Sequence, residues 1–287
     1  MGLPPLFLRA PNHLGDGVMA LPAVTALAAA AEGCRVAAPA WGEVLYRATG
    51  ARWVPREVRP TRDEVAVLLT PSFRAAWQAW RADRRVGLAT DGRRLLLTDA
   101  VRPPGGHRRE DYAAVAAALG VAVAGPPCFS ATEEESSAWA GLPLHVGLNP
   151  VSVSGETVEW PHYAALVRAL SEPLRVYCGP GEADRARAAI PGVAQVAGLP
   201  LGALAGALAR CRVLVSNDSG VAHFARACGV RTVVIFGSTT AARTGPAGCV
   251  AVEGPNLPCR PCYRKRCDRG LACLRAIGPE RVLEVLG

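Results

Sequence analysis

Hydrophobic residues along the chain come in short continuous runs, separated by longer stretches in which apolar and polar positions follow helical spacing. Such runs between helices are typical of parallel strands that helices cover on both faces of the sheet. In the first half the predicted strands are 6–8, 35–38, 65–69 and 86–88, and the predicted helices are 14–31, 42–49, 72–82 and 110–119. In the second half the strands are 145–149, 174–177, 213–215 and 232–236, and the helices are 161–171, 181–189, 201–209 and 220–228.

The pattern becomes irregular between 121 and 145, where Gly125 is followed by two prolines and 133–135 is an acidic run. Prolines and glycines at such density are typical of a linker. We therefore predict an α/β chain of two doubly wound, Rossmann-like domains, 1–143 and 144–287. Open sheets of this type bind ligands outside the carboxyl ends of their strands, so we expect a site in the cleft between two facing domains.

Composition narrows the class of protein. With 287 residues, 50% hydrophobic and 20% charged, the chain is not disordered, collagen-like or a small disulfide scaffold. Of the net charge of +8, residues 260–275 contribute +5, from six basic residues and one aspartate. So local an excess does not indicate nucleic-acid binding. No leader pattern and no apolar stretch of bilayer length is present, so we expect a cytoplasmic protein, at most peripheral to a membrane.

The first candidate site follows strand 6–8, where Asp16 stands between Gly15 and Gly17 close to the start of a helix. Glycines beside a carboxylate let another molecule approach it closely, which favours a general base. The alternative is that Asp16 only caps the helix.

The second candidate site follows the strand at 213–215. A strand, small polar residues and then a helix start together form a phosphate site, because free amides and the positive end of the helix dipole face the ligand. A carboxylate such as Asp218 suits sugar hydroxyls. The next loop adds three hydroxyls and Arg243, which would complete a diphosphate pocket. The predicted donor-binding residues are Asn217, Asp218, Ser219, Gly220, His223, Gly237, Ser238, Thr239, Thr240 and Arg243. The alternative is that Asp218 or Ser219 caps the helix and His223 belongs to the core.

These segments, together with Trp160-Pro161, Leu96-Leu97-Thr98 and the cysteines from Cys259 onward, resemble glycosyltransferase family 9, the heptosyltransferases of the lipopolysaccharide inner core. The order and spacing hold from residue 6 to the end of the chain. The resemblance implies a GT-B fold, with the acceptor at the N-terminal domain and the nucleotide-sugar at the C-terminal domain. It also implies an inverting transfer from an ADP-heptose-like donor to a lipid-linked saccharide without a catalytic metal, with Asp16 as the base. The acceptor-side residues would be Asn12, His13, Gly15, Ser72 and Arg74. For Arg74 the alternative, which we weigh equally, is a solvated surface arginine without a role in the site.

One departure from the family concerns the donor phosphates. A lysine usually stands two residues before the Trp-Pro pair, and here that residue is Val158. Either Arg243, which we favour, or another arginine supplies the missing cation, or the donor binds weakly or is a different one. The alternative is a nucleotide-sugar-binding protein with impaired catalysis.

Four cysteines, Cys259, Cys262, Cys267 and Cys273, lie close enough in sequence for one tetrahedral zinc ion. Reduced thiols and disulfides are the alternatives, and in no case is the cluster catalytic. A zinc-bearing nucleic-acid module is the least favoured function, because it leaves both polar sites unexplained. The basic segment 260–275 would instead steer the protein toward anionic lipid or a phosphorylated acceptor.

Overall fold

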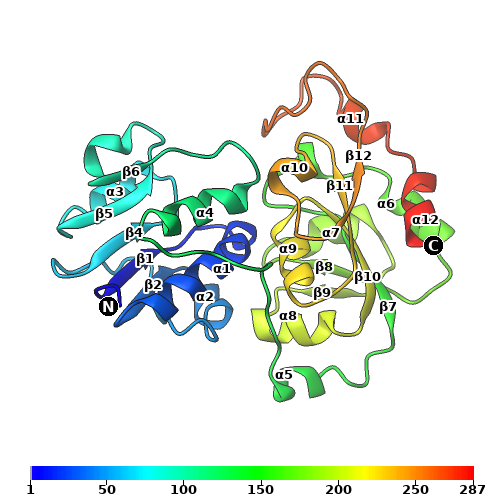
Figure 1. Ribbon diagram of the computed structural model, residues 1–287. Helices are drawn as coiled ribbons and strands as arrows, with labels where there is room; N and C mark the ends of the chain where they lie inside the picture. The colour runs from blue at the N-terminus through cyan, green and yellow to red at the C-terminus, as the bar shows by residue number, and fades with distance from the viewer. Residues whose placement is uncertain (1) are drawn as a thin grey trace. The chain divides into compact units, whose positions relative to one another are not determined.

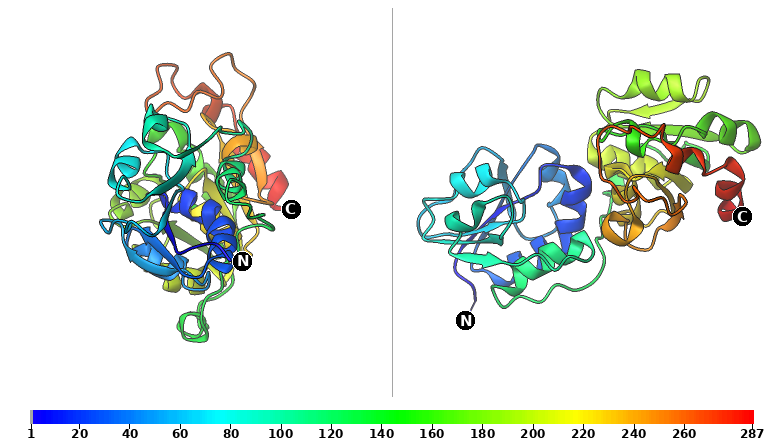
Figure 2. Two further views of the ribbon diagram at one scale, coloured as in Figure 1. Left: turned by 60° about the vertical axis from the view of Figure 1, so that its left-hand side comes forward. Right: turned by 90° about the horizontal axis from the view of Figure 1, so that it is seen from above.

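The computed structural model describes residues 2–287, and the chain divides after Pro127 into two compact units. Each unit holds one parallel sheet of six strands (Figure 1). Helices lie on both sides of each sheet (Figure 2), as the continuous apolar runs predict. The predicted α/β class with two doubly wound units is confirmed.

In the first unit the strands are β1 (Leu6–Arg9), β2 (Cys34–Ala38), β3 (Arg52–Pro55), β4 (Val65–Leu68), β5 (Arg84–Leu88) and β6 (Asp99–Val101). The helices are α1 (Leu14–Ala30), α2 (Trp41–Leu45), α3 (Phe73–Gln78), the 3-10 helix η1 (Arg93–Leu96) and α4 (Arg108–Ala117). The strand order is β3-β2-β1-β4-β5-β6. All residues of β1 and β4 are buried, because these strands lie at the centre of the sheet.

Close packing of α1 against α2 explains one glycine beside Asp16. A Cβ at Gly17 would lie 2.6 Å from the Trp41 ring, and the Tyr46 hydroxyl donates to the Gly17 carbonyl at 3.3 Å. Gly17 therefore makes room for the protein's own aromatic side chains. The sequence argument assigned that space to a ligand, and for Gly17 this is wrong.

The second unit contains β7 (His145–Asn149), β8 (Leu174–Cys178), β9 (Gln195–Ala197), β10 (Cys211–Asn217), β11 (Thr232–Phe236) and β12 (Val250–Glu253). Its helices are α5 (Glu133–Ser137), the 3-10 helix η2 (Glu156–Val158), α6 (Tyr163–Ala169), α7 (Ala183–Ala189), α8 (Leu201–Leu208), α9 (Gly220–Ala227), α10 (Ala241–Thr244), α11 (Ala272–Arg275) and α12 (Pro279–Leu286). The strand order is β12-β11-β10-β7-β8-β9.

Both sheets share one topology. From one edge to the other, each runs third, second, first, fourth, fifth and sixth strand of its own unit. The chain reverses its direction of travel across the sheet between β1 and β4 in the first unit, and between β7 and β10 in the second. In open α/β sheets the ligand lies outside the carboxyl ends of the strands at this switch point.

The unit boundary lies at 127/128, earlier than the 143/144 boundary that the sequence predicts. The difference arises because residues 128–143 pack on the second unit. The Phe129 amide donates to the Ala227 carbonyl at 2.8 Å, and α5 lies on α8, where a Cβ at Gly206 would come within 1.9 Å of the Glu135 carbonyl oxygen. The predicted linker therefore contains a helix, which a capping box between Thr132 and Glu135 begins.

Candidate active site

The switch point of the second sheet carries a hydrogen-bonded polar group. The Ser219 hydroxyl donates to the Asn149 side-chain oxygen at 2.7 Å and accepts from the Ala222 amide at 3.3 Å. Ser219 is thus the N-cap of α9 and is tied to the end of β7. The first amides of a helix have no partners within it, so the start of α9 has donors to offer an anion at this edge of the sheet. Gly220 is the first residue of that helix.

Asn217, at the end of β10, is fully buried. Its side-chain oxygen accepts from the Trp160 amide at 3.0 Å and from the Tyr163 hydroxyl at 3.3 Å. The Trp160 ring nitrogen in turn donates to the Ile277 carbonyl at 2.7 Å. These contacts give Asn217 a clear structural task, which is to fix the Trp160-Pro161 corner beside the switch point.

Asp218 and His223 lie together next to that corner. The Thr244 hydroxyl donates to one Asp218 oxygen at 2.7 Å, and the His223 Nε2 atom is 3.9 Å from the other. The side chains of His223 and Asp218 are only 5% and 9% exposed. His223 is buried, as the core alternative expects, but it faces a carboxylate that the sequence assigned to the donor site.

The Arg260 side chain supports the loop 237–240. The Arg260 guanidinium donates to the carbonyls of Gly237 at 2.8 Å and Thr239 at 3.3 Å, and to the Glu253 carboxylate at 2.8 Å. The Ser238 carbonyl accepts from the Cys262 amide at 3.0 Å. Arg260 was counted in the basic segment 260–275, yet its side chain is 8% exposed and shapes this loop.

Three buried polar atoms at the carboxyl edge of the second sheet have no hydrogen-bond partner among residues 2–287. They are Glu182 Oε1 after β8, Asn217 Nδ2 at the end of β10 and Thr239 Oγ1 after β11. Buried polar groups are nearly always paired with protein, water or ligand, so these three atoms are available to a ligand at this edge. The sequence analysis missed Glu182. The signal was available, since an acidic residue after the second strand of a Rossmann unit commonly binds a ribose.

The position of the absent lysine is part of the core. Val158 ends η2 and is 4% exposed. Beside it, Glu159 accepts from the Ser152 amide at 2.9 Å and pairs with Arg185 of α7. Arg243 lies in α10, directly after the hydroxyl loop that ends at Thr240. The loop after β11 therefore brings a cation to the edge of the sheet that carries the predicted donor-binding residues.

In the first unit, Asp16 lies in the first turn of α1, with His13 at the N-cap position. Asp16 therefore does not cap the helix. Its carboxylate is 2.9 Å from the Arg108 Nε atom, and the Asp16 side chain is 17% exposed. The pKa of the Tyr112 hydroxyl is raised by burial and by the Asp16 charge, while a hydrogen bond to Arg108 opposes the shift. Sequence reasoning missed Arg108, because only the fold brings α4 to the start of α1.

The predicted acceptor-side residues follow β1 and β4, the two strands of the switch point. Asn12 and His13 are exposed, Gly15 lies in the first turn of α1, and the Asn12 side-chain oxygen accepts from Arg9 at 3.2 Å. Ser72 caps α3 by accepting from the Ala75 amide at 3.4 Å. Arg74 is exposed, as its solvated alternative predicts.

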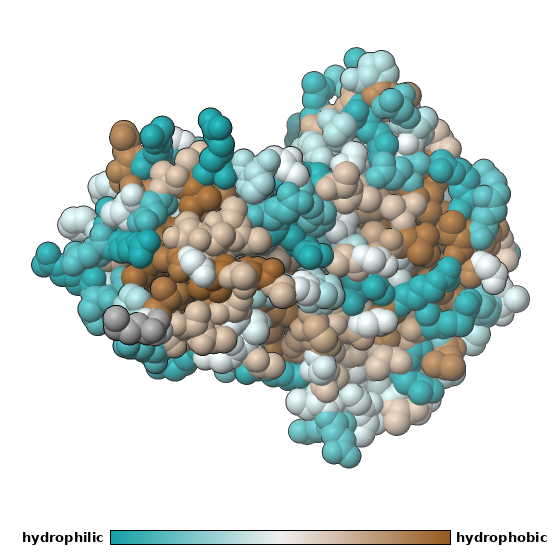
Figure 3. Space-filling view, viewed as in Figure 1, coloured by the Kyte–Doolittle hydropathy of each residue, from teal (hydrophilic) through white to brown (hydrophobic). Residues whose placement is uncertain are grey.

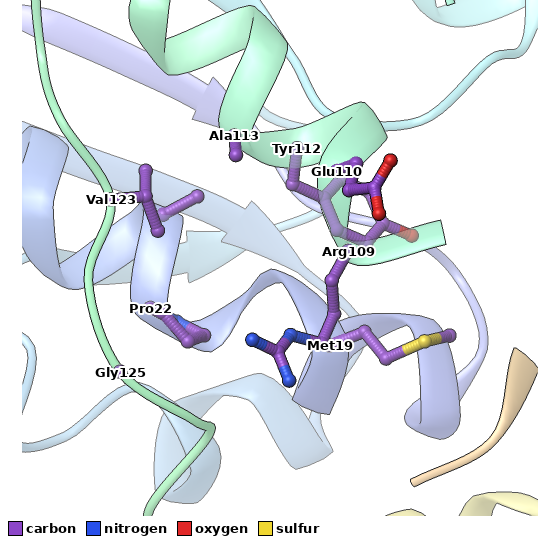
Figure 4. Close-up of a pocket in the computed structure, with 9 residues that line it drawn as sticks. Met19, Pro22, Arg109, Glu110, Tyr112, Ala113, Val123 and Gly125 are labelled. Carbon is purple, nitrogen blue, oxygen red and sulfur yellow. The ribbon is translucent and has the colours of Figure 1, made fainter. Parts of the chain in front are cut away.

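A shallow groove in the first unit lies between α1 and α4 and contains none of these residues. Figure 4 shows Arg109 reaching from α4 toward Met19 and Pro22 of α1. Glu110, Tyr112 and Val123 also line it. Because Tyr112 interacts with Arg108 and Asp16, the groove adjoins the Asp16 side of the candidate active site.

The cysteines between 259 and 273 do not form a metal site in the structure. Among residues 2–287, no three metal-ligating side chains come together, and all ten cysteines are free. The Cys267 sulfur accepts from the amides of Arg269 and Leu271, both at 3.4 Å. Zinc stays a prediction that metal analysis of the purified protein tests.

The model of glycosyltransferase family 9 (heptosyltransferase) matches residues 53–272, which is most of the chain and includes the whole polar edge of the second sheet. The chain belongs to glycosyltransferase family 9. The resemblance noted from the motifs is confirmed.

Individual relatives agree with this family. The chain is 31% identical over 175 residues to lipopolysaccharide heptosyltransferase 1 of Pseudomonas aeruginosa, a match that spans 52% of this chain and 49% of that protein. The chain thus spans about half the length of this curated relative. A further match, 35% identical over 83 residues, is to lipooligosaccharide heptosyltransferase 2 of Campylobacter jejuni and covers 27% of this chain and 25% of that protein.

Solved structures of this family share the fold. The ADP-heptose lipopolysaccharide heptosyltransferase II of E. coli is 22% identical, with a TM-score of 0.77 over 100% of this chain and 97% of that one. The E. coli heptosyltransferase WaaC with ADP is 16% identical, with a TM-score of 0.72 over 99% and 97% of the two chains. The GT-B fold expected for the family is therefore confirmed. Among residues 2–287, no helix has the length and apolar character needed to cross a bilayer.

Proposed function

We propose that the chain is an inverting glycosyltransferase that moves a heptose-type sugar from an ADP-linked donor to a lipid-linked saccharide of the lipopolysaccharide type. The observation that carries this proposal is the polar edge of the second sheet. Buried unpartnered atoms of Glu182, Asn217 and Thr239 lie there, with the start of α9, at the switch point of a Rossmann-like unit. Family membership and the activities of the named relatives support the heptose and the acceptor class.

The second unit binds the donor. The first amides of α9, from Ser219 and Gly220, and the hydroxyls of the loop 237–240 would hold the diphosphate. Arg243 supplies the positive charge that the family's lysine would provide at position 158. The leaving diphosphate thus gains its stabilisation from dipoles and an arginine, and no metal is needed in this scheme.

Two carboxylates at the carboxyl edge of the second sheet, Asp218 and Glu182, bind hydroxyl groups of the donor. Asp218, which His223 and Thr244 position, binds hydroxyls of the transferred sugar. Glu182 uses one oxygen to accept from the Gly179 amide at 2.7 Å and has the other available for the ribose. A carboxylate between two vicinal hydroxyls accepts a hydrogen bond from each of them, which favours a ribonucleotide.

Asp16 of the first unit acts as the general base. It removes the proton from the acceptor hydroxyl as that oxygen attacks the anomeric carbon, and the bond from that carbon to the diphosphate oxygen breaks. A single displacement of this kind inverts the anomeric centre. Arg108 keeps the carboxylate oriented from 2.9 Å away. Asn12, His13, Gly15, Ser72 and Arg74 lie on the acceptor side, and the reaction takes place at the inner face of the cytoplasmic membrane.

A second candidate function is nucleotide-sugar binding without turnover. The observation that favours it is the buried Val158 at the position of the family's lysine. Transfer activity separates the two functions.

Donor binding is tested first, by calorimetry with ADP, UDP and GDP. We expect ADP to bind best. Glu182→Gln should weaken ADP binding by roughly tenfold to a hundredfold, since a hydrogen bond to a charged group contributes about 1.5–3 kcal/mol. It should weaken the binding of 2′-deoxy-ADP much less. An equal loss for both nucleotides would remove Glu182 from the ribose site.

Transfer is tested with Asp16→Asn. A positioned base contributes about 10²–10⁴ to the rate, so we expect turnover to fall by that factor while donor affinity is retained. Unchanged turnover would remove Asp16 from the mechanism. A wild-type protein that binds ADP-heptose and transfers nothing to any lipopolysaccharide acceptor would support the binding function instead.

A further inference from the structure

The helix α3 and the turn that follows it present large aromatic side chains to solvent. Phe73, Trp77 and Trp80 are 50%, 60% and 58% exposed. Their spacing of four and then three residues places them on one face of the helical turns. The segment therefore has a continuous exposed aromatic stripe.

The opposite face of the same segment is small and buried. Ala75, Ala76, Ala79 and Ala82 are each at most 4% exposed, and the last three pack with Ala66 and Leu68 of β4. An ordinary surface helix buries its large apolar residues, because burial of apolar area is what stabilises the fold. Here the arrangement is reversed. The aromatic side chains contribute little to the core, and an exposed apolar patch of this kind marks a surface that contacts something else.

The 3-10 helix η1, which contacts α3, adds Leu95 with an exposure of 94%. Figure 3 shows hydrophobic side chains beside hydrophilic ones over the end of the first unit that carries α3. We define the α3 surface as these exposed apolar residues and the arginines among them: Phe73, Trp77, Trp80, Leu95, Arg74, Arg81 and Arg94.

The charge of the α3 surface is positive. Arg74, Arg81 and Arg94 are exposed and form no ion pair with any residue in 2–287. The neighbouring Arg84, by contrast, forms an ion pair with Asp99 at 2.9 Å. Two exposed carboxylates lie nearby in the sequence: Asp83, which pairs with Arg62 at 3.1 Å, and Asp91. Available guanidinium groups next to aromatic rings match a lipid interface, where arginine meets phosphate and tryptophan lies at headgroup depth.

We propose that the α3 surface docks the protein on an anionic lipid bilayer. The proposal rests on the proposed function, because a lipid-linked acceptor lies at such a surface. In that function Ser72, the N-cap of α3, and Arg74 are acceptor-side residues, so a membrane at α3 would bring the anchored end of the acceptor close to them. The basic segment 260–275 fits this role less well, because Arg260 is buried in the donor loop.

The test is co-sedimentation of the full chain with vesicles of phosphatidylcholine alone or with about one third phosphatidylglycerol. We expect binding to the anionic vesicles that weakens at high salt. Trp77→Ser/Trp80→Ser should reduce partitioning by roughly tenfold or more. Arg81→Gln/Arg94→Gln should weaken binding severalfold and reduce its salt dependence. All four side chains are exposed, so thermal unfolding should stay near that of the wild type.

A matched control is Arg264→Gln/Lys265→Gln/Arg266→Gln, which removes the same kind of charge from the second unit. This variant should bind vesicles like the wild type. The proposal is overturned if the wild type ignores anionic vesicles, if the tryptophan variant binds as well as the wild type, or if the control variant loses binding. A wild-type dimer that the tryptophan variant converts to monomer would also overturn it, since a second copy would then cover the surface.

Donor binding, measured on the same preparations, separates this inference from the proposed function. A wild-type protein that binds ADP but does not bind anionic vesicles rejects the docking surface alone. Absence of ADP binding in the wild type rejects the function on which the docking role rests.

Discussion

In the proposed function, single residues determine how the chain balances the charge of the donor diphosphate. The family's lysine is replaced by Val158, and Arg243 follows the hydroxyl loop after β11. A charge-assisted contact contributes about 1.5–3 kcal/mol. We therefore expect Arg243→Ala to weaken ADP-sugar binding by roughly tenfold to a hundredfold, measured by calorimetry. Arg243→Lys, which keeps the charge, should retain most of the affinity. If Arg243→Ala binds like the wild type, the cation comes from elsewhere.

The burial of Val158 leads to a prediction about restoring the lysine. Val158 is 4% exposed, so an ammonium group there would be buried without a partner. We expect Val158→Lys to lower the free energy of unfolding by about 3–5 kcal/mol, measured by urea denaturation. Val153→Lys is the matched control, because Val153 is 81% exposed in the same loop and the change should cost under about 0.5 kcal/mol. Equal stability of the two variants would show that position 158 opens to water.

Residues that directly follow a strand could be found from the sequence, and residues that reach the site from another element could not. Asp16 and Ser219 stand where a central strand meets a helix, a pattern visible in the chain itself. Arg108 comes to Asp16 only because α4 packs on α1. Arg260 reaches the loop 237–240 only through the return of the chain after β12. Such contacts depend on the tertiary structure, which local sequence patterns do not predict.

At the scale of elements, the loop after β11 depends on one arginine. Removal of the Arg260 side chain would leave the Gly237 carbonyl and the Glu253 carboxylate without their buried partner. The Glu253 side chain is 35% exposed, so water can solvate its carboxylate, and we expect Arg260→Ala to cost about 1–3 kcal/mol of stability through the unpaired carbonyls. The loosened loop should also weaken donor binding. Circular dichroism melts and calorimetry measure the two effects.

The control for that element is Arg264→Ala. Its side chain is 61% exposed and pairs with Asp268 at 3.4 Å, so the loss should be within about 0.5 kcal/mol. The loop argument fails if both variants lose the same stability, or if Arg260→Ala keeps the donor affinity of the wild type.

The strands that sequence reasoning missed have one physical property in common. They are β3, β6, β9 and β12, the two edges of both sheets. A central strand is buried on both faces and needs a continuous apolar run, as in Thr232–Phe236, whose predicted bounds are those observed. An edge strand is more exposed and tolerates Arg52 or Gln195, so its sequence lacks that run.

At the scale of the whole molecule, each unit has its own sheet and core. Residues 128–287 hold a complete six-stranded sheet, together with every predicted donor-binding residue. We expect this fragment, expressed alone, to fold cooperatively and to bind ADP within about tenfold of the full chain's affinity. It should show no transfer, because Asp16 is in the other unit. A fragment that begins at 144, the boundary predicted from sequence, should be less stable, since it lacks α5 beneath α8. A disordered fragment 128–287 would contradict the independence of the unit.

The separation of the two sheets along the chain also bears on how the protein reaches its native state. No strand is exchanged between them, since β1 to β6 all precede Pro127 and β7 to β12 all follow it. Parallel sheets form slowly, because each strand pair must wait for its crossover, and an unpaired edge invites association with other chains. Because the ribosome releases all six strands of the first sheet before any of the second emerges, that sheet has the time of translation to close by itself. The chain thereby avoids having twelve nascent strands of similar topology compete for partners at once.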